Sequence, residues 1–312
     1  MVGEKIVTDI ISFHTKIWSQ LQKIHLSKQV GNAYLFFGPP GCGKEGMAIQ
    51  FAQLLNCEDP KIYCCNSCSS CKRFSSLQHQ NLKLIFPLPI QKKTSGIIED
   101  GIGGKELDLI TESIVNKSKD PFFKIKIPKA NRIPIQSIRS LRKSLYLKTE
   151  KFGRQVVIVF DSHLLSEGQG ESGNAFLKLL EEPPDRCTII LVSDYSELLL
   201  PTIISRCQKI RFSRLTDDFI NKWLKREGVQ KEALKLLTSL SRGNIHQARF
   251  SSSQSLDDLV IIMDDLVKLI NQEDPKRWRS FIQTYSKLAN QNYVKFSFHF
   301  FLMKIWFYSA NR

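Results

Sequence analysis

Short runs of consecutive apolar residues alternate along this chain with longer segments in which apolar residues recur every three or four positions. The runs at residues 33–37, 156–160 and 188–192 predict strands buried on both faces, because a strand with one exposed face would alternate apolar and polar side chains. Helical spacing over residues 135–147 and 174–182 predicts helices among these strands. Strands that alternate with helices are typical of an α/β domain with a parallel sheet.

The pattern changes near residue 215, after which it is helical with no clear strand. We therefore expect an α/β domain over residues 1–214, a small helical domain over 215–250 and a helical C-terminal domain over 251–312. Residues 87–131 mix prolines, glycines and charges of both signs, so we interpret them as an insertion with little core of its own.

Composition limits the classes of protein to which the chain can belong. It has 312 residues, 42% of them hydrophobic, with no apolar run long enough to cross a bilayer and no basic-then-apolar leader at its start. Five of the eight cysteines fall between residues 57 and 71, which favours a metal site in a reducing compartment over a disulfide scaffold. We expect a cytoplasmic globular protein without a membrane partner.

A glycine-rich loop lies between the first predicted strand and a helix predicted over residues 47–55. Gly38, Gly41 and Gly43 would let backbone N–H groups close around phosphate oxygens, while Lys44 would neutralise the outer phosphates. A plain glycine-rich turn is the alternative interpretation. The next residue is Glu45, where a nucleotide-hydrolysing loop has a Ser or Thr hydroxyl for Mg²⁺, so productive binding of ATP with Mg²⁺ is doubtful.

The strand predicted at residues 156–160 is followed by Asp161, the position of a metal-holding carboxylate, but the glutamate expected next to it is replaced by Ser162. A serine hydroxyl cannot accept a proton from water at neutral pH, and His163 is one residue out of place. Loss of a general base costs on the order of 10²- to 10⁴-fold in rate. We therefore expect a degenerate nucleotide site without ATP hydrolysis.

Four cysteines have a spacing that lets tight turns place their thiolates around Zn²⁺: Cys57, Cys65, Cys68 and Cys71. Several unrelated buried thiols are the alternative. Spacing leaves open whether Cys64 or Cys65 is a ligand. Because the set contains no His and already numbers four, we expect a structural zinc ion rather than a catalytic one with an open position.

Positive charge is concentrated in one stretch of a chain whose formal net charge is +15. Residues 117–154 contain twelve Lys or Arg residues and only two acidic residues. Such a stretch is either an address for a polyanion or a solvated helix face. It does not establish nucleic-acid binding by itself.

Arg206 lies between a segment predicted as a helix, residues 197–204, and a predicted strand at 208–212. A lone arginine at a helix end is ordinarily a surface charge. A guanidinium in such a place can also stabilise the charge on the γ-phosphate bound by a neighbouring molecule, in the transition state of phosphoryl transfer.

Four segments together resemble the bacterial clamp-loader AAA+ subunits of DNA polymerase III: residues 33–36, the cysteine cluster, residues 174–184 and residues 205–207. The resemblance covers about residues 5–250. It implies an α/β P-loop NTPase (AAA+) domain with a parallel sheet and an inserted zinc module, followed by a small helical lid domain and an all-α C-terminal collar.

Within this family the chain is similar to the delta-prime type, in which the ATP-hydrolysing residues are eroded and the Ser-Arg-Cys motif is kept. The resemblance implies that Arg206 completes the ATP site of a neighbouring ATPase subunit in trans. It also implies that His246 stands in place of a second sensor arginine, and that Ser193 lies near the first sensor position. The implied partners are the gamma or tau ATPase and delta subunits in a hetero-pentamer, the sliding clamp, and primed DNA within the assembly.

Two alternative functions stay open at this point. An active clamp-loader ATPase of the gamma or tau type would use Glu45 and His163 as substitutes for the missing groups. A zinc-containing DNA-binding module with a vestigial P-loop would instead use the basic stretch. ATP hydrolysis by the isolated chain and its salt-dependent binding to DNA distinguish these alternatives.

Overall fold

The chain forms two compact units, Met1–Arg214 and Leu215–Arg312. In the part of the chain that the structure describes, no helix is long and apolar enough to cross a membrane. The division of the second unit at residue 250 stays a prediction. The structure is a computed structural model, which describes residues 10–60, 63–89, 104–146, 153–167, 170–253, 268–270 and 275–291.

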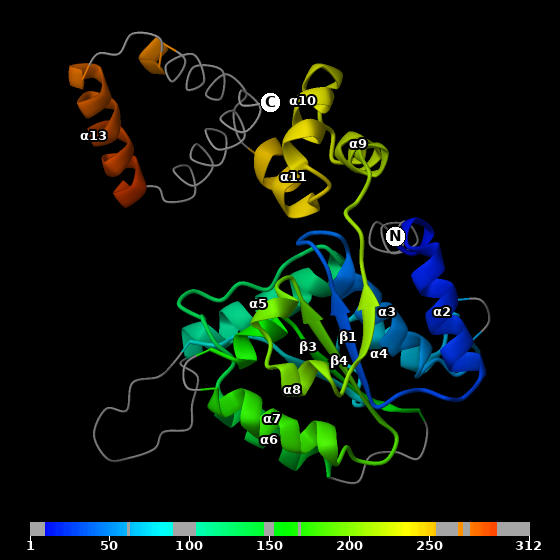
Figure 1. The fold of residues 1–312 in the computed structure, drawn as a ribbon. Coiled ribbons are helices and arrows are strands. Elements are labelled where there is room, and N and C mark those ends of the chain that lie inside the picture. The colour runs from blue at the N-terminus through cyan, green and yellow to red at the C-terminus, as the bar shows by residue number, and fades with distance from the viewer. Residues whose placement is uncertain are drawn as a thin grey trace. The chain divides into compact units, whose positions relative to one another are not determined.

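A five-stranded parallel sheet forms the centre of the first unit (Figure 1), as the sequence predicts. In the order β2-β3-β4-β1-β5, the central strands β3 and β4 are buried along their whole length. The edge strand β2 was not predicted, because it is short, only partly buried and interrupted by Lys83. The strands are β1 (Ala33–Phe37), β2 (Leu82–Ile85), β3 (Gln155–Val159), β4 (Cys187–Ser193) and β5 (Gln208–Arg211).

Helices cover both faces of this sheet, because the alternate side chains of its buried strands are apolar in both directions. On one face, Leu35 and Ile189 share a core with Ile138 and Phe176 from two helices, α6 and α7. On the other face, Tyr34 meets Phe51 of α3 edge-on at 5.6 Å between ring centroids. The helices are α2 (Thr15–Leu26), α3 (Lys44–Leu54), α4 (Ser69–Ser75), α5 (Gly104–Lys119), α6 (Ile135–Leu145), α7 (Glu171–Glu181) and α8 (Pro201–Ile204), with short 3-10 turns η1 (Ser162–Leu165) and η2 (Ser196–Leu198).

The segment predicted as an insertion without much core contributes to the interior of the first unit. Residues 104–119 form α5, and Phe122, Ile125 and Ile127 after it are buried, as is Ile110 within it. The expectation of little core was therefore wrong for this part. Its buried apolar residues are separated by prolines and lysines, so they form no pattern that predicts a buried face. Residues 90–103 of the segment lie outside the described residues.

The second unit is helical over its described residues. Thr216 accepts a hydrogen bond from the Phe219 N–H at 3.3 Å and begins α9, while Asn244 begins α11 in the same way. His246 lies in the first turn of α11, where its N–H donates to the Asn244 side chain at 3.0 Å. Buried Trp223 belongs to the core of this unit. The helices are α9 (Asp217–Arg226), α10 (Lys231–Ser241), α11 (Ile245–Ser252) and α13 (Pro275–Gln291).

Candidate functional site

The glycine loop joins β1 to α3 with a backbone that only glycine accommodates at several positions. A Cβ atom at Gly38 would lie 2.5 Å from the carbonyl oxygen of Phe212. Gly41 and Gly43 have φ angles of +67° and +91°, in the left-handed region that L side chains avoid. Strand, loop and helix therefore have the arrangement that lets backbone N–H groups face a phosphate at a helix N-terminus.

Lys44 is almost completely buried, and its ammonium group is satisfied by the protein itself. It donates to the carbonyl oxygens of Gly38 and Pro39 at 2.9 and 2.6 Å and forms an ion pair with Asp194 at 2.7 Å. These acceptors match the three N–H donors of an ammonium group. The lysine predicted to hold outer phosphates is thus held by its own loop and by a carboxylate.

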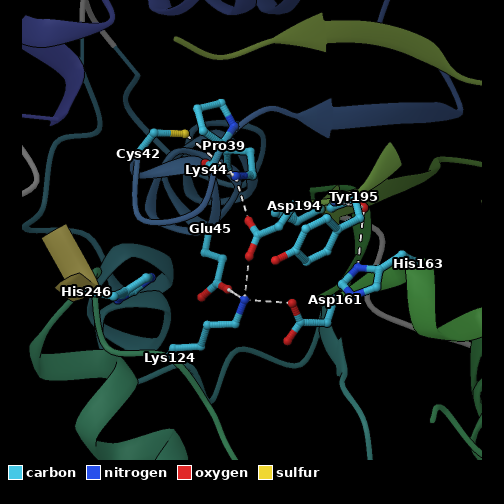
Figure 2. A network of polar contacts seen from close by, with 12 residues as sticks. Pro39, Cys42, Lys44, Glu45, Lys124, Asp161, His163, Asp194, Tyr195 and His246 are labelled. Atoms are coloured by element: carbon cyan, nitrogen blue, oxygen red, sulfur yellow. Dashed lines mark hydrogen bonds and ion pairs between the residues drawn. The ribbon is translucent and has the colours of Figure 1, made fainter. Parts of the chain in front are cut away.

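Asp161 and Asp194 lie where the strands reach their carboxyl ends, which is also where the glycine loop begins; we call this end of the strands the sheet edge. Asp161 comes two residues after β3, Asp194 directly follows β4, and the loop follows β1, the next strand along the sheet. Parallel neighbouring strands end at the same edge, which explains why these groups meet (Figure 2). Sequence reasoning missed Asp194, although its position directly after a buried strand was a usable signal.

A second lysine, Lys124, reaches this edge from the segment between α5 and α6. Its Nζ atom lies 2.7 Å from a carboxylate oxygen of Asp161, 2.8 Å from one of Asp194 and 4.0 Å from one of Glu45 (Figure 2). Its side chain is 18% exposed. The sequence placed Lys124 in the basic stretch, and its role inside the protein was not predicted.

A third lysine, Lys117 of α5, has a side chain with no exposure to solvent. It forms a close ion pair with Glu45 and donates to the carbonyl oxygens of Pro121 and Phe123 at 2.9 and 2.6 Å. Glu45, the residue that replaces the usual Ser or Thr, is therefore bound to a cation of the chain. The interpretation of residues 117–154 as a wholly external charge stretch was wrong at Lys117 and Lys124.

The ion pairs change the proton affinities of the groups at this edge. Burial alone would raise the pKa of Asp194, but Lys124 and Lys44 lower it to about 2. Burial alone would lower the pKa of Lys124, but the carboxylates of Glu45, Asp161 and Asp194 raise it above its ordinary value. Both groups are charged at neutral pH, as the geometry of the network requires.

The two residues after Asp161, Ser162 and His163, make internal contacts that do not suit them to act as a general base. The buried Ser162 hydroxyl donates to the carbonyl oxygen of Val192 on β4 at 3.1 Å. Nδ1 of the buried His163 lies 3.4 Å from the hydroxyl of Ser193, and burial lowers the pKa of His163 below its ordinary value. Both side chains therefore make contacts within the protein interior. Neither takes the position of the carboxylate that activates water in an ATPase.

The four predicted cysteines come together in a second site, which could hold a metal ion. Their Sγ atoms all lie within 4.8 Å of one another. Sγ of Cys65 lies 3.9 Å from Sγ of Cys71, close to the edge of about 3.8 Å expected for a tetrahedron with metal–sulfur bonds of about 2.3 Å. Cys64 is not one of these four: its Sγ lies 3.9 Å from the carbonyl oxygen of Gln50, and its contact with the Cys71 thiol raises the pKa of Cys71.

Backbone N–H groups favour the thiolate form at Cys65, whereas burial raises the pKa of Cys57 to about 12 and also raises the pKa of Cys68. The N–H groups of Cys65, Cys68 and Cys71 donate to the sulfur atoms of Cys57, Cys65 and Cys68, each at 3.3 Å. The bond from Cys68, followed by those from Ser67, lowers the pKa of Cys65 to about 6. Such bonds favour the charged sulfur that binds a metal ion.

Arg206 lies away from the glycine loop, between α8 and β5. Its guanidinium donates to the Thr202 carbonyl at 2.9 Å and forms an ion pair with Glu181 at 2.7 Å, and its side chain is 38% exposed. The predicted helix over residues 197–204 is split into η2 and α8. Arg206 precedes β5, whereas the glycine loop follows the parallel strand β1. Arg206 therefore lies at the amino ends of the strands and the loop lies at their carboxyl ends.

Comparison with known proteins gives matches to subunits of DNA polymerase III. Residues 13–216 match the model of the family DNA polymerase III, delta subunit. The chain is 30% identical over 260 residues to DNA polymerase III subunit tau of Bacillus subtilis, covering 81% of this chain and 38% of that protein. It is 24% identical over 271 residues to subunit delta' of Pseudomonas aeruginosa, covering 86% of this chain and 69% of that protein.

The chain spans less than two thirds of the length of several of these relatives. For subunit delta' of Bacillus subtilis, to which it is 26% identical over 232 residues, the match covers 74% of this chain and 56% of that protein. Among solved structures, a DNA polymerase III gamma subunit-related protein from Thermotoga maritima is 19% identical, with a TM-score of 0.43. That match covers 89% of this chain and 76% of the other.

Proposed function

Because the chain belongs to the DNA polymerase III delta subunit family, we propose that it is the delta-prime subunit of a clamp loader. In this role it assembles with gamma or tau ATPase subunits and a delta subunit into a hetero-pentamer. That assembly loads the sliding clamp onto primed DNA in the cytoplasm. The chain supplies structure and one arginine to the assembly and has no ATP hydrolysis of its own.

The site at the sheet edge supports the absence of hydrolysis. The residue after Lys44 is a carboxylate already paired with a buried lysine, and the place of the catalytic glutamate is taken by a serine bonded to β4. An ATPase of this class needs a metal-holding hydroxyl and a group that positions water at these two places. Both are missing here, and loss of either group lowers the rate of hydrolysis.

The position of Arg206 carries the proposal that it acts in trans. Arg211 pairs with Phe37, the last residue before the glycine loop, and Arg206 stands five residues earlier. Gln208, the first residue of β5, pairs with Tyr34, so at about 3.3 Å per residue the start of β5 lies roughly 10 Å along the strands from the loop, and Arg206 lies in the turn before it. A guanidinium this far from its own loop, and partly exposed, is suited to the phosphates of a neighbouring subunit rather than to its own site.

We also propose that the cysteine cluster holds a structural zinc ion. Four thiolates at tetrahedral spacing leave no open position for a substrate or water. Cys57 and Cys65 lie in the segment between α3 and α4, Cys68 caps α4 and Cys71 lies in its first turn, so a bound ion would join this segment to α4.

The test of the proposed function is ATP hydrolysis by the assembled loader with clamp and primed DNA. We expect Arg206→Ala to lower the rate at the site it completes at least about tenfold, because arginine fingers contribute 10³- to 10⁵-fold in related phosphoryl transfers. Arg211→Ala, at an exposed arginine of β5, is the matched control and should leave the rate unchanged. Equal rates for wild type and Arg206→Ala would refute the role of Arg206.

Likeness to tau and gamma/tau relatives supports a second candidate, a subunit that hydrolyses ATP itself. The isolated chain distinguishes the two functions. Hydrolysis by the purified chain that is lost in Lys44→Ala would establish the second candidate, whereas the proposed function predicts no hydrolysis in either protein.

A further inference from the structure

The carboxylates at the sheet edge stand where a P-loop enzyme holds its metal ion. In such enzymes Mg²⁺ is bound by the residue after the loop lysine and by the aspartate of the acidic strand. The corresponding residues here are Glu45 and Asp161. The ammonium group of Lys124 lies 4.0 Å from Glu45 and 2.7 Å from Asp161, so a cation of the chain lies beside both metal-holding positions (Figure 2).

The charges of this network are already balanced, which makes the site a poor fit for Mg²⁺ with a nucleotide. Glu45, Asp161 and Asp194 supply three negative charges, and Lys44, Lys117 and Lys124 supply three positive ones. A divalent cation placed among the carboxylates would be repelled by the ammonium group of Lys124. At this short range and with little solvent, such a repulsion is only weakly screened.

The position of Lys124 is maintained by the packing of its neighbours along the chain. Phe122, Ile125 and Ile127 are 2%, 6% and 7% exposed, so the backbone on both sides of Lys124 is anchored in the core. Lys126, two residues further on, is exposed. Both lysines lie beside buried residues, but the Lys124 side chain is only 18% exposed because it contacts the carboxylates of Asp161 and Asp194.

We propose that Lys124 is a built-in counter-cation that replaces the divalent metal ion of the nucleotide site. The chain consequently keeps this edge of its sheet in one charged, closed arrangement without Mg²⁺ and without nucleotide. The inference concerns this chain alone and does not depend on the role of Arg206, so its test and the assembled-loader assay can fail separately.

The test is the binding of Mn²⁺, a paramagnetic substitute for Mg²⁺, measured by electron paramagnetic resonance on the full chain with its cysteine cluster loaded with zinc. Wild type should bind Mn²⁺ at the sheet edge only weakly. Lys124→Ala leaves three neighbouring carboxylates without this cation, and oxygen ligands suit Mn²⁺ and Mg²⁺. We expect this variant to bind one Mn²⁺ at least about tenfold more tightly than wild type, and adding Asp161→Asn should abolish the gain.

Lys126→Ala is the matched control, because it removes the same side chain from an exposed position two residues away. It should bind Mn²⁺ no better than wild type and unfold at the same denaturant concentration. Lys124→Ala should unfold at a lower denaturant concentration, and millimolar Mn²⁺ should restore part of the loss.

Two results would overturn the proposal. One is stoichiometric Mn²⁺ binding by wild type that Asp161→Asn removes, a measurement that needs no Lys124 variant. The other is a folded Lys124→Ala protein whose Mn²⁺ affinity equals that of wild type. If Lys124→Ala does not fold, Lys124→Gln, which keeps the length and polarity of the side chain, takes its place in the same comparison.

Discussion

Lysine and aspartate seldom enter a protein interior, because removal of a charge from water costs several kcal/mol unless an opposite charge is close. Asp194 meets this condition with two ammonium groups, Lys44 at 2.7 Å and Lys124 at 2.8 Å. It therefore connects the glycine loop to the segment after α5. Of the residues at the sheet edge, Asp194 is the one on which both of these lysines depend.

Replacement of Asp194 by asparagine tests this dependence through pH. The two lysines lower the pKa of Asp194 from its ordinary value of 3.8 to about 2, so the ionised carboxylate stabilises the fold above pH 4. This contribution is lost as pH falls from about 4 to about 2. We expect Asp194→Asn to lower the free energy of unfolding by about 2 kcal/mol at pH 7.

Urea unfolding of both proteins at several pH values provides the measurement. The difference between wild type and Asp194→Asn should shrink below pH 4, whereas acid release of any metal ion held by the cysteine cluster would affect both proteins alike. A difference that stays constant down to pH 2 would show that the carboxylate is not stabilised by its lysine partners.

At the residue scale, the sequence predicts groups that depend on local order and misses groups that depend on distant pairing. Glu45 and Ser162 are defined by their positions after the loop lysine and after the acidic strand, so each departure from an ATPase is readable directly. The partners Lys124 and Asp194 are 70 positions apart in the chain. No sequence motif predicts an ion pair between residues so far apart. In the sequence, a lysine buried in an ion pair also looks the same as a lysine exposed to solvent.

Among the elements, the continuous apolar strands were predicted best. β1 has the predicted bounds, and β3 and β4 differ from the predicted segments by one residue at their ends. Burial on both faces makes such strands distinct from their surroundings. The edge strand β2 lacks that signal, and α5 lies in a segment whose charges and glycines conceal its buried face.

The loop between α3 and α4 carries a prediction at the same scale. Cys65 lies in the sulfur cluster, whereas its neighbour Cys64 is directed to Gln50 on α3. We expect Cys65→Ser to lower the zinc content from one ion per chain to well below half, and to destabilise the fold because metal binding contributes to folding. Cys64→Ser should keep the full zinc content.

Elemental analysis by mass spectrometry of the purified variants, combined with thermal unfolding, measures both effects. Full zinc content in Cys65→Ser together with loss in Cys64→Ser would reverse the assignment of ligands. Equal zinc content in wild type and both variants would show that the ion is bound elsewhere in the chain.

For the whole molecule, the net charge of +15 overstates what is presented to a polyanion. Lys117 and Lys124 are neutralised inside the first unit. Arg154 donates to Thr188 and to the carbonyl oxygens of Val30 and Cys187. The basic stretch that supports a DNA-binding module therefore has fewer external charges than its composition indicates.

The external charges of this stretch include one face of α6, where Arg139, Arg142 and Lys143 are exposed. Each phosphate contact contributes about −0.9 to the slope of log K against log salt concentration. We expect DNA binding by the isolated chain to be weak, and its slope to become shallower by up to about 3 when these three residues are replaced by alanine. Lys124→Ala should leave the slope unchanged, because Lys124 is paired with Asp161 and Asp194.

Fluorescence anisotropy with a labelled primed duplex over a range of salt concentrations measures these slopes. An unchanged slope in the triple variant would exclude the face of α6 from DNA contact. If Lys124→Ala changed the salt dependence as much as replacement of an exposed lysine does, the ion pairs of Lys124 would have to open when DNA binds. Nanomolar binding by the isolated chain at physiological salt would favour the DNA-binding module over a subunit that meets DNA only within an assembly.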